Sequence, residues 1–363
     1  MARDNFAWIC TWKITHRCNL SCTYCDHTVM RPAGANERVD YRRIAAGLER
    51  FAPKIVNISG GEPTLVAGLP DIVRDLKSRF NPFIRIVHNG TQPHKAVPAF
   101  PYIDRLVVSV DGPGDVNRAT RGIDGNRVVD KLGAIVDDAA MNGVELAVNT
   151  VVTKNNLGSL GELADRIHRV APSIVLSLTP VMPPDGPLSI LLRDDLLEEF
   201  ECTYQGLRER GVHVMHTFDS VRRHTTFSCI ECFNQFFTIR VSPEGRISAC
   251  PMNVPLKAAV AHVPVRKLVS IRGLKHALAE TVKAAKARFG RDIDFSCSTI
   301  CNCESWLDML FLGMESNAAP VYLRGLHGRL GDRDYAGLEE FVKTNINPDF
   351  DIAAFRKRVD AAV

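Results

Sequence analysis

The sequence lacks a long apolar run. No stretch of its 363 residues approaches the roughly 18 apolar residues that a transmembrane helix needs. The start, MARDNFAWICTWK, has neither the apolar stretch nor the small-residue cleavage site of a signal peptide. The charge is nearly balanced at +4, so the composition predicts no extended basic face for nucleic acid. We therefore expect a cytoplasmic protein without a membrane span.

Cysteine is absent from residues 26–201, although the chain has 11 cysteines. The others form two groups and two isolated positions. The first group is Cys18, Cys22 and Cys25; the second is Cys229, Cys232, Cys250, Cys297, Cys301 and Cys303; Cys10 and Cys202 stand alone. Clustered cysteines in a cytoplasmic protein more often bind metal than form disulfides. Two separate metal centres are the simplest interpretation, and we expect Cys10 and Cys202 to be small buried apolar side chains.

Apolar, β-branched runs alternate with helical patterns through the first 215 residues or so. The predicted strands are Trp8–Thr15, Ile55–Ser59, Ile84–His88, Leu106–Val110, Glu145–Val152 and Ile174–Pro180. The predicted helices are Tyr41–Phe51, Leu69–Phe80, Arg127–Asn142, Leu157–Val170 and Asp194–Arg210. Repeated strand–helix units predict an α/β fold in which a parallel sheet curls into a full or partial barrel. In such barrels the chemistry lies at the carboxyl ends of the strands.

The pattern changes near residue 217. "FTIRVSPEGRISAC" alternates around Pro-Glu-Gly, which predicts a β-hairpin. A basic helix over Arg266–Arg288 follows, and we interpret its charged side as a solvated face. From Glu304 on the chain looks helical. These changes predict a barrel over residues 1–216, a small α+β domain over 217–320 and a helical extension over 321–363.

The first cysteine group, "CNLSCTYC", directly follows the first predicted strand. Its spacing puts three thiolates on one short loop that can surround a small iron–sulfur cluster. Such clusters are usually held by four cysteines, so three would leave one iron open for another ligand. A zinc site is the alternative, and it would need a fourth ligand such as His16 or His27.

A second motif follows the second strand. "NISGGEP" contains Gly60, Gly61 and Glu62, where two glycines permit close backbone approach and a carboxylate can pair with an ammonium group. Together, CxxxCxxC and GGEP resemble the radical S-adenosylmethionine (SAM) superfamily. That resemblance implies that the open iron binds the amino and carboxylate groups of SAM, that Glu62 and the glycines bind its amino group, and that Tyr24 contacts the adenine.

Further segments are similar to the family at strand ends. "VHNGT" places Asn89 like the family's "TNG", "VVSVDG" places Ser109, and "RATRG" places Arg121. The resemblance implies that Ser109 and Arg121 hold the ribose and carboxylate of SAM. Asn149, on the fifth strand, is a further candidate for the ribose.

The resemblance also implies a mechanism. A reduced [4Fe-4S] cluster passes an electron to SAM, and the resulting 5′-deoxyadenosyl radical abstracts a hydrogen atom from the substrate. A flavodoxin- or ferredoxin-type protein would supply the electron. In some family members a cysteine donates a hydrogen atom to the substrate radical, which is the alternative for Cys10 or Cys202; Cys10 would then have to point into the barrel.

The second cysteine group resembles the SPASM and twitch domains that follow many radical SAM barrels. Cys232, Gly245 and Cys250 match the opening half of their pattern, and the later cysteines depart from it. Six cysteines cannot fully ligate two clusters, so we predict one auxiliary [4Fe-4S] cluster, as in the twitch domain. The predicted ligands are Cys232, Cys250, Cys301 and Cys303, with Cys229 and Cys297 as alternates. A zinc site is again the alternative.

The substrate is less defined by the sequence. Only 17 residues precede Cys18, which leaves no space for an N-terminal peptide-recognition domain and favours a small molecule. The auxiliary cluster would then accept an electron in a dehydrogenation-type oxidation. A ribosomally made peptide is the alternative substrate. His88, Asn149, Met182 and Arg240 are candidates for lining the pocket, and no catalytic residue is assigned.

Overall fold

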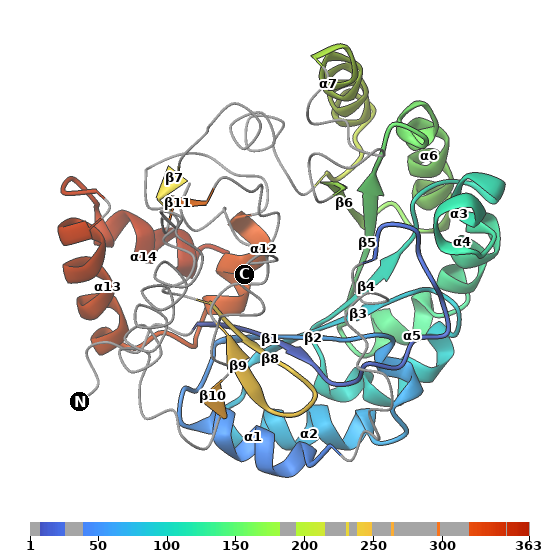
Figure 1. Ribbon diagram of the computed structural model, residues 1–363. Coiled ribbons are helices and arrows are strands. Elements are labelled where there is room, and N and C mark those ends of the chain that lie inside the picture. The colour runs from blue at the N-terminus through green and yellow to red at the C-terminus, as the bar shows by residue number, and fades with distance from the viewer. Residues whose placement is uncertain are drawn as a thin grey trace, which may run out of the picture.

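In the part of the chain that the structure describes, seven parallel strands form a curved sheet, with helices covering its convex side (Figure 1). The computed structural model describes residues 8–25, 39–181, 194–214, 230–231, 238–248, 263–264, 296–297, 319–345 and 347–362. The parallel strands, in spatial order, are β8 Thr238–Val241, β1 Ile9–Lys13, β2 Ile55–Ser59, β3 Phe83–His88, β4 Arg105–Ser109, β5 Glu145–Val152 and β6 Val175–Pro180. The sequential order β1 to β6 confirms the predicted partial barrel.

The described helices agree with most of the predicted ones. They are α1 Tyr41–Glu49, α2 Leu69–Phe80, α3 Gly114–Arg121, α4 Gly125–Gly133, α5 Val136–Met141, α6 Leu160–Val170, α7 Asp194–Glu209, α12 Ala319–Leu326, α13 Asp332–Asn345 and α14 Ile352–Asp360. No helix in the described ranges is long and apolar enough to span a membrane.

One predicted helix differs from the structure, and one described helix was not predicted. The single helix predicted over Arg127–Asn142 is two helices, α4 and α5, which separate after Gly133. Glycine is a poor helix former, and a Cβ at Gly133 would lie 3.4 Å from Val170 of α6. The sequence also gave no signal for α3, whose eight residues, GDVNRATR, carry no apolar stripe.

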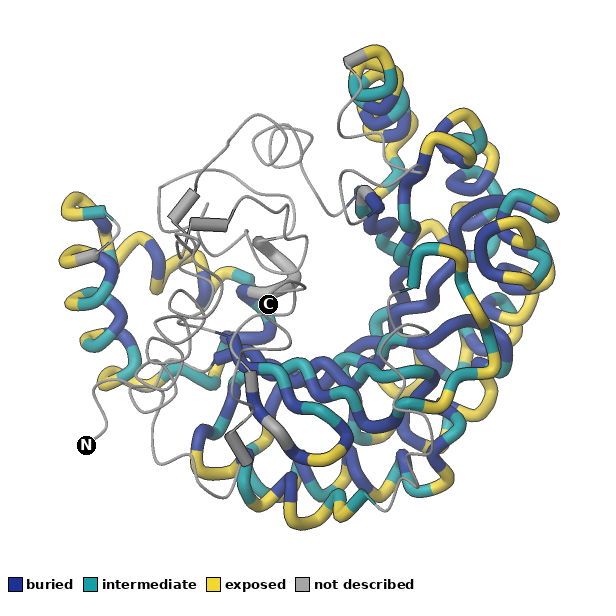
Figure 2. The backbone as a smooth tube through the Cα atoms, viewed as in Figure 1, coloured by how far each residue is buried: buried dark blue, intermediate teal, exposed yellow. Residues whose placement is uncertain are grey.

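The main hydrophobic core lies between the sheet and the helices (Figure 2). Alternate strand residues such as Trp12, Ile58, Ile86 and Val108 are fully buried there. Cys10 belongs to this cluster and is fully buried. The prediction of a buried apolar role for Cys10 is therefore confirmed, and its side chain lies on the helix-covered face rather than inside the barrel.

The opposite, inner face of the sheet is more open and more polar. Lys13, Arg85, Asn149 and Arg240 alternate with core residues on their strands, and all four are half-buried. This places Asn149 and Arg240 where a pocket-lining role requires them. His88 lies on the other face and is buried, so its predicted pocket-lining role was wrong. Met182 lies outside the described residues.

The predicted hairpin is present, and it extends the barrel sheet. β8 pairs antiparallel with β9 Arg246–Ser248, which in turn pairs with β10 Val263–Pro264. β8 also pairs in parallel with β1, a long-range contact that the local pattern does not predict. Gly245 in the turn has φ +75°, and a Cβ there would lie 3.0 Å from Ile44 of α1. The turn therefore needs glycine for its conformation and for its packing.

The C-terminal helices pack against the amino ends of the strands. Twelve buried residues form a second hydrophobic cluster: Trp8, Ile9, Ile55, Phe83, Leu323, Leu326, Tyr335, Leu338, Val342, Phe350, Phe355 and Val359. A buried ion pair lies at the same end. Glu145 at the start of β5 accepts hydrogen bonds from the fully buried Arg105 of β4 and forms an ion pair with Arg324 of α12.

Glu145→Ala should lower the free energy of unfolding of the metal-free protein by about 3 kcal/mol, because it leaves a buried guanidinium without this carboxylate. Urea denaturation measures the change. Glu339→Ala, which removes an exposed pair with Lys343 on α13, is the control and should cost about 0.5 kcal/mol or less. Equal losses in the two variants would contradict the assignment.

Candidate functional site

The motifs singled out in the sequence meet at the carboxyl edge of the sheet. The cysteine loop follows β1, Gly60–Glu62 follow β2, Asn89 follows β3, and Ser109 ends β4. Because the strands are parallel, these ends lie on one side of the barrel.

The segment after β2 runs against the end of β1. Gly61 N donates to Thr15 O at 2.7 Å, and Glu62 N donates to Arg17 O at 2.7 Å. Gly60 has φ +147°, and a Cβ there would lie 2.6 Å from Thr15 O. A side chain at Gly60 would therefore collide with the backbone that leads into the cysteine loop.

Glu62 is almost fully buried, and both of its carboxylate oxygens accept hydrogen bonds from the protein. Oε1 accepts from Thr64 N at 2.9 Å and Thr64 Oγ1 at 2.6 Å, and Oε2 accepts from Asn89 N at 2.8 Å. Glu62 thus caps the helical turn Pro63–Leu65 and fixes the start of the segment after β3. Its contact with the SAM amino group stays a prediction.

Asn89 connects the third strand to the cysteine loop. Its Nδ2 donates to Asn19 Oδ1 at 2.8 Å and lies 3.8 Å from Cys18 Sγ, and its Oδ1 accepts from Thr91. Leu20 N also donates to Cys18 Sγ at 3.5 Å. Donors that point at a cysteine sulfur suit a thiolate that binds iron.

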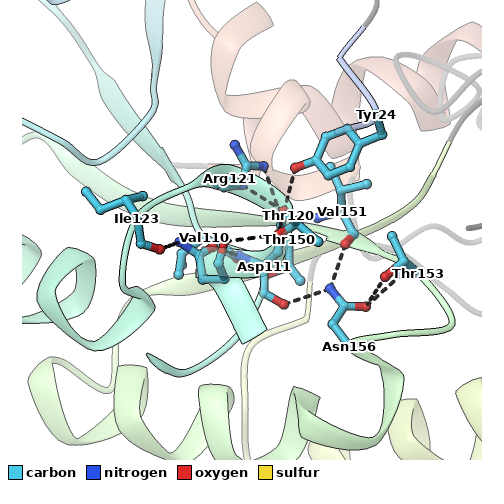
Figure 3. Close-up of polar contacts among 11 residues, drawn as sticks. Tyr24, Val110, Asp111, Thr120, Arg121, Ile123, Thr150, Val151, Thr153 and Asn156 are labelled. Carbon is cyan, nitrogen blue, oxygen red and sulfur yellow. Dashed lines mark hydrogen bonds and ion pairs between the residues drawn. The ribbon is translucent and has the colours of Figure 1, made fainter. Parts of the chain in front are cut away.

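Tyr24 and Arg121 meet at a residue that the sequence analysis did not single out, Asp111 (Figure 3). The Tyr24 hydroxyl donates to Asp111 Oδ2 at 2.5 Å, and Arg121 Nη2 donates to Asp111 Oδ1 at 2.9 Å. The Arg121 guanidinium also lies over the Tyr24 ring, 5.5 Å from its centroid. Tyr24 and Arg121, both predicted to bind SAM, therefore bind Asp111 in this structure. Their predicted contacts with SAM are not tested. The available signal for Asp111 was an acidic residue directly after a buried strand.

Burial shifts the pKa values of this cluster. Burial raises the pKa of Tyr24 well above its ordinary value, with Arg121 opposing and Asp111 adding to the shift, so the phenol stays protonated and donates. Burial also raises the pKa of Cys22 to about 11, and the positive charge of Arg121 only partly opposes this rise. Metal binding at Cys22 must therefore release a proton near neutral pH.

The strands next to this cluster align three polar residues. Ser109, Asn149 and Ser177 are register partners across β4, β5 and β6. Asn149 Oδ1 accepts from Thr179 Oγ1 at 3.2 Å on the inner face. Ser109 and Asn149 are thus brought together as predicted, and their contact with the SAM ribose is not tested.

The three cysteines of the first group are half-buried on one loop. Among the described residues, no three His, Cys, Asp or Glu side chains converge on a single metal ion. A cubic cluster does not need such convergence, since each cysteine binds a different iron. Of the ligands proposed for the zinc alternative, His16 has its Nε2 2.7 Å from Glu244 Oε1 in the β8–β9 turn, and His27 lies outside the described residues.

Of the remaining cysteines, the structure describes Cys202 and Cys297. Cys202 on α7 is exposed, so the prediction that it is buried was wrong. Cys297 lies in β11 Ser296–Cys297, which pairs with β7 Ile230–Glu231. Cys229, Cys232, Cys250, Cys301 and Cys303, and the predicted helix Arg266–Arg288, fall outside the described residues.

Comparison with known proteins agrees with this geometry. The model of the radical SAM superfamily matches residues 12–170. Mycofactocin maturase MftC of Mycobacterium ulcerans is 31% identical over 177 residues, covering 45% of this chain and 47% of that protein. A probable GTP 3′,8-cyclase of Methanococcus aeolicus is 29% identical over 191 residues, covering 48% and 60%. The chain thus spans about half the length of the curated relatives that it matches.

Solved structures share the fold. Streptococcus suis SuiB bound to S-adenosylmethionine has a TM-score of 0.60 at 16% identity, covering 86% of this chain and 76% of that one. The protein anSMEcpe with bound AdoMet has a TM-score of 0.56 at 15% identity, covering 98% of both chains. The radical SAM superfamily model thus matches residues 12–170, which include the cysteine loop and strands β2 to β5, and these solved structures share the fold.

Gly60→Ala should destabilise the protein by more than about 1 kcal/mol and weaken SAM binding, because the new methyl group meets Thr15 O and the φ angle disfavours alanine. Thermal unfolding and calorimetric titration with SAM measure the two effects. Gly68→Ala is the matched control, since a Cβ at Gly68 meets nothing within 4 Å and its φ is −86°. Wild-type SAM binding by Gly60→Ala would show that this close approach is not needed.

Proposed function

We propose that this protein is a radical SAM enzyme that holds a [4Fe-4S] cluster on Cys18, Cys22 and Cys25 and removes a hydrogen atom from its substrate. When bound, the cluster supplies the electron that cleaves SAM, and the 5′-deoxyadenosyl radical so formed abstracts the hydrogen atom. The protein's own residues bind and orient SAM and shape the substrate pocket.

One observation carries the proposal. The backbone N–H of Asn89 donates to Glu62 Oε2, and the side chain of Asn89 approaches Cys18 Sγ. The ends of β1, β2 and β3 are thereby joined in one hydrogen-bonded unit around the cysteine loop. An ordinary turn at GGEP would not require this connection to the cysteines.

The inner face of the sheet is the proposed place for SAM and substrate. Ser109 and Asn149 face it beside the carboxyl edge, where they would hold the ribose of SAM. Lys13, Arg85 and Arg240 add positive charge on three strands of the same face.

A second [4Fe-4S] cluster is proposed for residues 217–320, on Cys232, Cys250, Cys301 and Cys303 with Cys229 and Cys297 as alternates. It would accept an electron from the substrate radical in a dehydrogenation-type oxidation. The electron that starts the reaction would come from a flavodoxin- or ferredoxin-type donor.

A small molecule is the first candidate substrate, and a peptide is the second. Two findings support the peptide: SuiB has been solved bound to the precursor peptide SuiA, and anSMEcpe with the Kp18Cys peptide. The first has a TM-score of 0.57 and the second also 0.57. MftC, by its name, is a maturase.

Anaerobically reconstituted protein given dithionite and SAM should form 5′-deoxyadenosine and should bind about eight irons, in two clusters. Cys22→Ala should form none and should bind about four irons, because one cluster loses a thiolate ligand. Cys202→Ala removes an exposed thiol of α7 and should match the wild type in both measurements. If the wild type forms no 5′-deoxyadenosine, the proposed function is wrong.

Deuterium transfer identifies the substrate class. Deuterated anionic metabolites and deuterated candidate peptides are each incubated with the reduced enzyme and SAM, and mass spectrometry detects label in 5′-deoxyadenosine. We expect transfer from a small molecule, which is the first candidate substrate. Transfer from a peptide alone would favour the maturase alternative.

A further inference from the structure

We propose that Asp111 is a positioning residue for the proposed iron–sulfur loop, which it holds through Tyr24, one of the two residues between Cys22 and Cys25. This proposal deepens the proposed function and rests on it for its catalytic consequence. The underlying contacts are hydrogen bonds within the metal-free protein.

Both carboxylate oxygens of Asp111 are fully used (Figure 3). Oδ1 accepts from Arg121 Nη2 at 2.9 Å and from Val151 N at 3.0 Å. Oδ2 accepts from the Tyr24 hydroxyl at 2.5 Å and Thr120 Oγ1 at 3.1 Å, and it lies 2.8 Å from Arg121 Nε. One side chain thus joins the cysteine loop, helix α3 and strand β5.

The backbone of Asp111 is fixed as well. Its N–H donates to Asn117 Oδ1 at 2.7 Å, and its C=O accepts from Asn156 Nδ2 at 2.7 Å. Asn156 Nδ2 also donates to Val151 O at 2.8 Å, and Thr150 Oγ1 donates to Val110 O at 2.7 Å. Because both the backbone and the side chain of Asp111 are fixed by hydrogen bonds, Asp111 can hold the loop that it binds in one position.

A second contact reaches the same part of the loop. Thr23 N donates to Thr120 O at 2.9 Å, next to the Arg121 guanidinium that covers the Tyr24 ring. Both residues between Cys22 and Cys25 are therefore attached to the Asp111 cluster. The spacing of these two sulfurs depends on that attachment.

The chemistry requires aspartate rather than asparagine. Asp111 is fully buried, and four donors plus one ion-pair contact surround its two oxygens. An asparagine would turn an NH2 group towards such donors and leave Arg121 without a counter-charge. The Arg121 guanidinium lies over the ring of Tyr24, which is flanked in sequence by Thr23 and Cys25. Loss of the carboxylate should therefore leave a net positive field beside the thiolates, which favours the reduced, more negative cluster.

The two variants separate position from charge. Tyr24→Phe removes the hydroxyl that reaches Asp111 and leaves the Asp111–Arg121 pair unchanged. Asp111→Asn removes the same contact and the charge. Asp104→Asn is the control. Asp104 lies just before β4, at the amino end of the strand and so at the opposite edge of the sheet from the cysteine loop, where it forms an ion pair with Lys77 and accepts from Ile84 N.

The first measurement is hydrogen exchange of residues 18–25 in the metal-free proteins. We expect roughly tenfold faster exchange in Tyr24→Phe and at least as much in Asp111→Asn, with wild-type exchange in Asp104→Asn. Because Tyr24→Phe removes a single hydroxyl, it keeps the test decisive if Asp111→Asn does not fold. Unchanged exchange in Tyr24→Phe, or equal acceleration in Asp104→Asn, overturns the proposal.

The second measurement uses the reconstituted proteins. In Tyr24→Phe the electron paramagnetic resonance spectrum of the reduced cluster should respond less to SAM, and the KM for SAM should rise more than kcat falls. In Asp111→Asn the midpoint potential should also be more positive than in Tyr24→Phe. Equal potentials in the two variants would refute the charge effect. If the wild type forms no 5′-deoxyadenosine while the exchange result holds, the proposed function fails and the positioning of the loop stands.

Discussion

The backbone pairing between β1 and the segment after β2 determines the geometry of the carboxyl edge. It continues beyond both strands, from Ile14 N to Ser59 O at 2.9 Å through Glu62 N to Arg17 O at 2.7 Å. It therefore ends one residue before Cys18. A methyl group at Gly60 would interrupt it. The cysteine loop and Glu62 both directly follow this paired backbone. Asn89, at the end of β3, then binds Glu62 through its backbone N–H and approaches Cys18 through its side chain.

Polar contacts stabilise this edge where apolar packing stabilises the rest of the barrel. Buried polar groups are costly unless they are hydrogen-bonded, and Glu62, Asp111 and Asn156 at this edge each have several partners. Asn156 shows the principle, because its amide bridges two backbone carbonyls while its Oδ1 accepts from Thr153 N at 2.7 Å. The loops of the site are held in place by such connections although they lack regular secondary structure.

The sequence predicted what local patterns encode. The bounds of β2, β5 and α2 agree with the predictions because apolar runs and a helical stripe define them. Helix α3 escaped prediction because its stability comes from buried polar residues, including Thr120 and Arg121, rather than from an apolar face.

The candidate site likewise contains residues that local motifs predict and residues that only the fold brings together. The cysteine spacing and GGEP are short motifs and were read directly from the sequence. Asp111 was not, because its partners come from the cysteine loop, α3 and β5, and only the fold brings them together. The parallel pairing of β8 with β1 is a contact of the same long-range kind.

The position of β1 in the sheet also bears on how the protein is made. β1 is the first described strand to leave the ribosome, yet it lies between β2 and β8, and Trp8 and Ile9 are covered by helices α12 to α14. Its second edge therefore stays unpaired until Val241 has been synthesised, and its amino end stays uncovered until the last helix is complete. The strand that leads into the cysteine loop is thus synthesised before the other described strands, and its packing is completed only with α14.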